Sequence, residues 1–342
     1  MRARGNGSDE ADEVGFGMAR KSPDPVTVLR GHRKSVQCVS FHQNETGEAV
    51  LFSGDQEGRL RVWDLERRRA RCDLRLYPRD AGFVSMKAFP GDGGSGPALL
   101  LTQGREGAVK CWDIDRLCSA SGEEGVDPLS SFSSGCYNFC RFSPSSSSAA
   151  GAGATNLVSI PGSDATVVEV WNAKDSERLS RIEPPKVEGK GSAGMCTALC
   201  MRASAGGEST ILWAGYEGGA AACWDLRFCA EPLGALAPGN QPIVSLDLDS
   251  TCFCGIAGTV GSDILQFKRS PSDPSEWRVE KVHTMKDPGV SEAVLRGDGR
   301  IFVSACWDGK VRVFDYKKER PLAVLKVCSL AHPLPCLRWP RD

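Results

Sequence analysis

The sequence predicts an all-β protein built from repeated units, and three observations support this prediction. Five short segments rich in Val and Cys close on Trp-Asp or a near variant, at Trp63, Trp112, Trp171, Trp224 and Phe314. With a degenerate copy at Phe267, these positions lie about 43 to 59 residues apart. Short apolar runs alternate with turns, for which 38 glycines and 20 prolines are available. A Trp-Asp repeat of about 40–45 residues, lengthened by loops, is typical of a β-propeller blade.

Each predicted strand follows from period-two alternation bounded by a Gly-containing turn. Before the first blade, residues 26–29 form a short apolar run followed by Gly31-His32, so we expect a strand there. Within the blades we expect strands over 36–41, 50–54 and 60–64, then 99–103 and 109–113, 211–215 and 221–225, 301–305 and 311–315, and an outer strand over 321–325.

The repeats divide the chain into three parts. Residues 1–24 are polar and read as a disordered tail. Residues 25–326 form the propeller, with a mobile loop expected over 145–154 and a polar loop after the fifth repeat over 270–275. Residues 327–342 are a divergent tail, with poor strand residues at Pro333, Pro335 and Pro340. Six repeats are readable, so we expect a WD40 propeller of the seven-blade type with the last blade incomplete and a gap, or a strained six-blade closure.

Composition excludes several classes of function. A net charge of −1 gives no field that attracts nucleic acid, and no apolar segment is long enough for a leader or a membrane span. The 15 cysteines contain no Cys-x-x-Cys pair, and four histidines leave no metal-ligand spacing, so we expect no metal and no cofactor. Cys136/Cys140 and Cys196/Cys200 stand four apart, which on a strand places each pair on one buried face. A thiol-rich chain of this kind suits the nucleus and cytoplasm.

One basic cluster stands out near the first blade. We interpret it as a solvated outer strand, and a docking site for an acidic partner is the alternative: Arg67, Arg68, Arg69, Arg71, Arg75 and Arg79.

Polar residues recur at fixed distances before the closing aromatic residue. Ten positions back stand the hydroxyl residues Ser53, Thr102 and Ser304, and six back stand Glu57, Glu106 and Asp308. We expect a turn carboxylate bonded to His32, with His32 bonded to a strand hydroxyl that meets the Trp. The residues expected to hold the blades together are His32, Ser53, Glu57, Trp63, Asp64, Thr102, Glu106, Trp112, Asp113, Trp171, Trp224, Asp225, Ser304, Asp308, Phe314 and Asp315.

An Asp, His and Ser set also resembles a hydrolase triad. The hydroxyl lies in mid-strand without a nucleophile elbow, and the set recurs partially in several blades, which a single active site would not do. We therefore expect no catalytic residue and no enzyme activity.

One short motif indicates an interaction. Trp224, Asp225 and Arg227 match the Trp-Asp-x-Arg core with which some propellers dock on the adaptor of cullin ubiquitin ligases. An exposed Arg at a blade end would suit pairing with a partner carboxylate. This makes a substrate receptor of a cullin-RING ligase the alternative interpretation.

Longer segments resemble one family, the guanine-nucleotide-binding-protein-β-subunit-like or ASTRA-associated propeller proteins. They cover 24–32, 101–107, 212–218, 287–292, 305–314 and 320–325, while 109–114 and 136–140 are similar to the plant branch, the DECREASED SIZE EXCLUSION LIMIT-like proteins. The resemblance implies a non-catalytic scaffold of a multi-subunit protein assembly. In this family, that assembly is linked to chromatin remodelling and to co-chaperone maturation of kinases. For the plant branch, it implies roles in embryo development and cell-to-cell transport.

Overall fold

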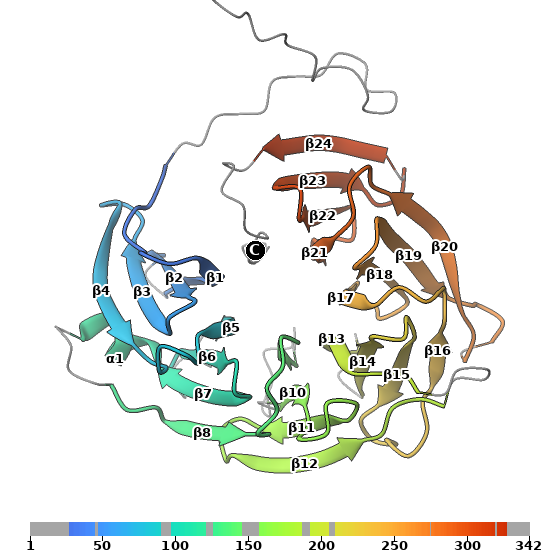
Figure 1. Cartoon of the computed structure of the whole chain (residues 1–342), viewed down its shortest axis with the longest axis horizontal. Coiled ribbons are helices and arrows are strands. Elements are labelled where there is room, and N and C mark those ends of the chain that lie inside the picture. The colour runs from blue at the N-terminus through green and yellow to red at the C-terminus, as the bar shows by residue number, and fades with distance from the viewer. Residues whose placement is uncertain are drawn as a thin grey trace, which may run out of the picture.

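The computed structural model describes residues 27–44, 47–89, 97–120, 126–145, 157–186, 192–204, 209–273, 275–318 and 320–326. The tails over 1–24 and 327–342 and most of the expected mobile loop over 145–154 lie outside these ranges. Within them, 24 strands form six four-stranded antiparallel sheets, which follow one another around a common centre (Figure 1). The architecture is therefore an all-β propeller, and each sheet is one blade.

The blades are consecutive in sequence. Blade one contains β1 (Val36–Gln43), β2 (Ala49–Asp55), β3 (Arg59–Asp64) and β4 (Arg69–Arg75). Blade two contains β5 (Phe83–Phe89), β6 (Leu99–Gly104), β7 (Ala108–Asp113) and β8 (Ser130–Ser133). Blade three contains β9 (Ser143–Pro144), β10 (Leu157–Pro161), β11 (Val168–Asn172) and β12 (Glu177–Ile182).

The second half repeats this order. Blade four contains β13 (Cys196–Ala203), β14 (Thr210–Tyr216), β15 (Ala221–Asp225) and β16 (Gly234–Leu236). Blade five contains β17 (Ile243–Leu248), β18 (Cys254–Thr259), β19 (Asp263–Arg269) and β20 (Trp277–Thr284). Blade six contains β21 (Val290–Leu295), β22 (Ile301–Cys306), β23 (Lys310–Asp315) and β24 (Arg320–Lys326).

The strands predicted inside the blades are confirmed, and each Trp-Asp variant closes the third strand of its sheet. Two expectations about these segments were wrong. Residues 27–29 are not in a strand, because no described sheet edge pairs with them. The polar loop over 270–275 joins β19 to β20, so it lies within blade five. A short helix, α1 (Ile114–Ser119), follows β7 because the Asp113 side chain caps it and Ile114 and Leu117 are buried.

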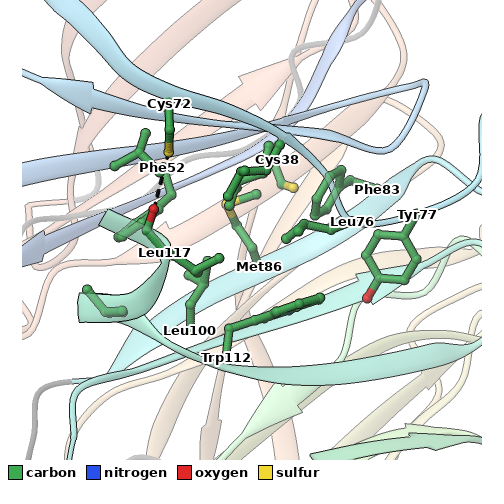
Figure 2. Close-up of a cluster of buried hydrophobic side chains, with 14 of the residues drawn as sticks. Cys38, Phe52, Cys72, Leu76, Tyr77, Phe83, Met86, Leu100, Trp112 and Leu117 are labelled. Atoms are coloured by element: carbon green, nitrogen blue, oxygen red, sulfur yellow. Dashed lines mark hydrogen bonds between the residues drawn. The ribbon is translucent and has the colours of Figure 1, made fainter. Parts of the chain in front are cut away.

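The core lies between neighbouring blades. Alternate residues of blade one, including Phe52 and Cys72, meet Met86, Leu100 and Trp112 of blade two in one buried cluster (Figure 2). The thiol of Cys72 donates to the carbonyl oxygen of Leu117 over 3.3 Å, which ties α1 to this interface (Figure 2). From blade two to blade six, the closing Trp or Phe thus packs against the blade before it, and stacking neighbours buries a core between them.

A β-bulge recurs near the start of the innermost strands β1, β5, β13, β17 and β21. In β13 it falls between Cys196 and Ala198, so the alternation of side chains shifts by one residue. Cys196 therefore packs toward blade three and Cys200 toward blade five. The prediction that this pair shares one face was wrong for that reason, although both thiols are buried.

The described blades form an open series. β1 packs on β5, and β13, β17 and β21 pack in order, whereas no comparable packing joins β21 to β1 within the described ranges. Figure 1 shows a wider interval between blade six and blade one than between other neighbours. One ion pair crosses the centre: Arg141 Nη1, before β9, lies 3.0 Å from Glu292 Oε1 on β21. Six blades are described, and a seventh is not among these residues.

Candidate functional site

Of the predicted polar set, His32, Ser53 and Trp63 come together in blade one. His32 lies in the segment before β1, and its Nε2 is 2.7 Å from Ser53 Oγ on β2. Trp63 Nε1, on β3, donates to the same Oγ over 2.7 Å. The His32 ring is fixed on its other side by Asp55, whose Oδ2 lies 3.0 Å from Nδ1. The network joins three successive segments of the blade through buried polar groups that satisfy one another.

The carboxylate of this network is Asp55 and not the predicted Glu57. Asp55 ends β2, two residues after Ser53, so both side chains project from the same face toward His32. Its Oδ1 accepts from the backbone N–H groups of Glu57 and Arg59, over 2.9 and 3.0 Å. Burial opposes ionisation of Asp55, but the hydrogen bonds from His32 and from these backbone groups outweigh it and lower its pKa. Glu57 instead faces Lys34 at 3.7 Å.

The Asp55, His32 and Ser53 sequence of contacts matches the connectivity of a hydrolase triad, but its surroundings do not suit a nucleophile. Ser53 is 4% exposed, and its hydroxyl accepts a hydrogen bond from Trp63. A cavity of about 380 Å³ beside blade one is lined by His32, Asp55 and several Arg side chains, and Ser53 is not among its lining residues. The Ser53 hydroxyl is thus enclosed in the blade, where it joins His32 to Trp63, and this arrangement holds the blade together.

Blade two builds the same network with a different partner. Trp112 Nε1 donates to Thr102 Oγ1 over 2.8 Å, and the Tyr77 hydroxyl lies 2.9 Å from the same oxygen. Figure 2 shows the Tyr77 hydroxyl directed toward Trp112. Tyr77 thus takes the place that His32 has in blade one, which the sequence analysis did not predict. Glu106 is exposed and takes no part.

Blades three and four depart further from the network of blade one. Trp171 Nε1 donates to Glu169 Oε2 over 3.0 Å, and Arg178 pairs with the other oxygen of Glu169. Blade four has Ala214 ten residues before Trp224, so it holds this Trp by apolar packing.

Blade six also lacks the predicted network. The Phe314 side chain has no N–H donor, and the Ser304 hydroxyl lies 3.7 Å from the Cys306 sulfur. Asp308 pairs with Arg312, with Oδ2 and Nη2 2.6 Å apart, instead of a His. Burial opposes ionisation of Asp308, but the hydrogen bond from Arg312 outweighs it and lowers the pKa of this carboxyl.

The acidic residue after the closing aromatic has one shared role. It accepts a backbone N–H two or three residues further along, at distances of 2.7 to 3.1 Å, for Asp64, Asp113, Asp225 and Asp315. Asn172 does the same in blade three. These residues cap the turn that leaves the third strand and do not belong to the His and Ser network.

The adaptor motif lies at the end of β15. Arg227 Nε and Nη2 pair with both oxygens of Asp225, over 2.6 to 3.1 Å, and the Arg227 side chain is 53% exposed. Phe228 beside it is 71% exposed, and the Arg227 guanidinium lies 5.7 Å from the centre of its ring. The loop therefore presents an Arg and an aromatic ring, while Trp224 is buried.

The described ranges contain no cluster of three or more metal-ligating side chains. No helix there is both long and apolar enough to cross a membrane. Burial raises the pKa of Cys72 to about 11 and of Cys200 to about 12, so these thiols remain protonated at neutral pH.

Comparison with known proteins agrees with this geometry. The family model for the WD domain, G-beta repeat, matches residues 23–64 and 279–315. The chain is a WD-repeat propeller. Over 326 residues, the propeller is 28% identical to guanine nucleotide-binding protein subunit beta-like protein 1 of Mus musculus, a match that covers 94% of this chain and 91% of that protein.

Two fungal relatives are named ASTRA-associated protein 1, and so belong to the second group that the sequence resembles. The propeller is 26% identical over 327 residues to ASTRA-associated protein 1 of Verticillium alfalfae, covering 90% of this chain and 76% of that one. It is 25% identical over 347 residues to the protein of the same name from Schizosaccharomyces pombe, covering 90% and 91%. The predicted relationship to both groups is confirmed.

Among solved structures, Chaetomium thermophilum Raptor matches 87% of this chain with a TM-score of 0.65 and 16% identity. The match covers 25% of that longer chain, so it supports the fold alone.

Proposed function

We propose that this propeller is a non-catalytic scaffold within a multi-subunit assembly of the ASTRA type. The observation that carries the proposal is similarity along 90% or more of the chain to proteins named for association with ASTRA. The buried state of every hydroxyl network described above supports a structural and not a catalytic use of these residues. The assembly would act in the nucleus and cytoplasm, in chromatin regulation and in co-chaperone maturation of kinases.

Segments 109–114 and 136–140, which resemble the plant branch, would add embryo development and cell-to-cell transport to the processes served. The partners are proteins, with no direct contact to nucleic acid and no membrane insertion.

Affinity purification with mass spectrometry tests the scaffold proposal. We expect the tagged full chain to recover several subunits of one assembly in fixed ratios that persist in 0.3 M salt. Turnover of a small substrate by the purified chain, without such subunits, would overturn the proposal.

A second candidate function is that of a substrate receptor of a cullin-RING ligase. Support comes from the exposed Arg227 and Phe228 at the end of β15. Replacement of Arg227 by Ala separates the two functions. Loss of a cullin adaptor from the purified material would favour the ligase, whereas unchanged recovery of ASTRA-type subunits would favour the scaffold.

We further propose that the six blades occupy six positions of a seven-blade ring, the seventh being filled by further polypeptide. The face of blade six that points away from blade five supports this proposal. Val294, Val311 and Val313 share that face and are only half-buried, whereas Phe302 and Phe314 on the opposite face are buried against blade five. An apolar sheet face of this kind requires a partner layer.

A further inference from the structure

Two aromatic side chains stand exposed on the segment between β8 and β9. Tyr137 is 64% and Phe139 67% exposed, and their rings meet edge to face with centroids 5.9 Å apart. The flanking Cys136 and Cys140 are buried, so this extended segment alternates thiols inward and rings outward. Exposed rings of this size, side by side, are uncommon on a surface that binds nothing.

The segment is fixed to the blades on both sides of it. The Asn138 N–H donates to the carbonyl of Arg105 in blade two, and its Nδ2 donates to the carbonyl of Cys196 in blade four, each over 3.3 Å. Asn138 Oδ1 in turn accepts from the N–H of Cys140 over 2.8 Å. The buried Gln103 then holds the end of the segment, where its Nε2 donates to the Cys140 carbonyl. The two rings are therefore pre-organised, which lowers the ordering cost of binding.

Arg105 completes the surface. It lies in the turn between β6 and β7, with its guanidinium 5.5 Å from the centre of the Phe139 ring. Its Nε is buried and has no hydrogen-bond partner in the described ranges, and its guanidinium forms no ion pair with any residue there. Because no carboxylate of the described ranges pairs with this guanidinium, Arg105 is suited to bind a carboxylate of a partner protein.

A second Arg and aromatic pair offers a direct comparison: Arg105 precedes the third strand of blade two, whereas Arg227 follows the third strand of blade four and so lies on the opposite side of the propeller. Arg227 also stacks on an exposed ring, Phe228, but both oxygens of Asp225 already pair with its guanidinium. The two Arg and aromatic pairs thus differ in whether the chain itself supplies the carboxylate.

We propose that Arg105, Tyr137 and Phe139 form a docking surface for a partner-protein segment that places a carboxylate next to a large apolar side chain. The carboxylate pairs with Arg105, and the apolar side chain packs on the two rings. Aromatic and Arg residues dominate binding energy at protein interfaces, and a fixed loop adds to their effect. This inference rests on the scaffold function proposed above and assigns it a face and a partner chemistry.

Selection with purified protein tests the inference independently of any assembly. A phage-displayed library of random dodecapeptides would be panned on the full chain, with the soluble variant Tyr137→Ser/Phe139→Ser present as competitor. Peptides that survive would be synthesised and measured by fluorescence anisotropy against the wild type, Arg105→Gln and Phe228→Ser. Thermal melts would check that all variants fold, which we expect of the ring variants because those rings are exposed and of Arg105→Gln because Gln keeps a polar side chain of similar reach.

We expect the surviving peptides to share an Asp or Glu beside Leu, Ile, Met or an aromatic residue. Arg105→Gln should weaken binding at least about tenfold, as should Asn or Gln in place of the peptide's acid, whereas Phe228→Ser should change it less than about twofold. No surviving peptide, a consensus without an acid, or equal affinity for Arg105→Gln would overturn the inference. Such a failure leaves recovery of assembly subunits from cells untouched, so it is distinguishable from failure of the scaffold proposal.

Discussion

At the scale of single residues, Ser53 is the point on which blade one converges. Its hydroxyl contacts His32 and Trp63, so Ser53→Ala leaves two polar groups without a partner. We expect a loss of about 1–3 kcal/mol in the free energy of unfolding, measured by urea denaturation. Ser304→Ala is the matched control, because within the described ranges the polar contact of that hydroxyl is with the Cys306 sulfur, and it should cost less than about 1 kcal/mol. Equal losses for the two variants would contradict the network's role.

Asp55 makes this stability depend on pH. Its pKa is lowered in the folded protein, so its contribution is present above its ordinary pKa of 3.8 and is lost as the pH falls through the lower folded value. The difference in unfolding free energy between wild type and Asp55→Asn should therefore be present at pH 7 and pH 5 and shrink below about pH 4. Urea denaturation at several pH values measures it. A difference that grows between pH 5 and pH 3 would show that the sign is wrong.

Spacing from the closing Trp located the hydroxyls Ser53 and Thr102 correctly but not their partners. The count of six residues led to Glu57, whereas the position that faces His32 is the last residue of β2, Asp55. Tyr77 was missed because a phenol before the blade can replace a histidine without any shared motif. Spacing along one strand is fixed by the pleat, but contacts between a loop and a strand depend on the tertiary fold.

At the scale of elements, the segment over 136–140 shows how an irregular stretch is held without strand pairing. Asn138→Ala removes its bonds to blade four and to the Cys140 N–H. Hydrogen exchange of the Cys140 amide should become about 5- to 30-fold faster, the equivalent of about 1–2 kcal/mol. Asn172→Ala serves as control, because Asn172 caps only its own turn. If both variants left this amide unchanged, Asn138 would not fix the segment.

Alternation in the sequence predicted most strands but not where the alternation shifts. The bulge after Cys196 turns Cys200 to the other face of β13, and nothing in the local composition marks it. Asp113 begins α1 instead of a plain turn because Ile114 and Leu117 bury an apolar face. The spacing of Cys136 and Cys140 predicted two buried thiols on one face of a strand. Both thiols are buried, but the segment is not a strand, and the exposure of the rings between them required the structure.

At the scale of the whole molecule, the sequence predicted the number of repeats but not how the ring of blades closes. Each blade carries its own pattern, whereas closure depends on one contact between distant parts of the chain. Val313, on the face of blade six that points away from blade five, provides a test. If polypeptide fills a seventh position, Val313→Asp should lower the free energy of unfolding by about 2 kcal/mol or more, because it buries a charge in an apolar interface. Thermal or urea denaturation that shows no loss would mean that this face is open to solvent.

The most direct test of the scaffold account is quantitative affinity purification from cells with three versions of the full chain. These are the wild type, Tyr137→Ser/Phe139→Ser, and Arg227→Ala/Phe228→Ser, which alters the opposite end of the propeller. The account predicts that wild type and the Arg227 variant recover the same ASTRA-type subunits in fixed ratios, and that the Tyr137 variant loses them. Recovery of no stoichiometric partner by the wild type would contradict it.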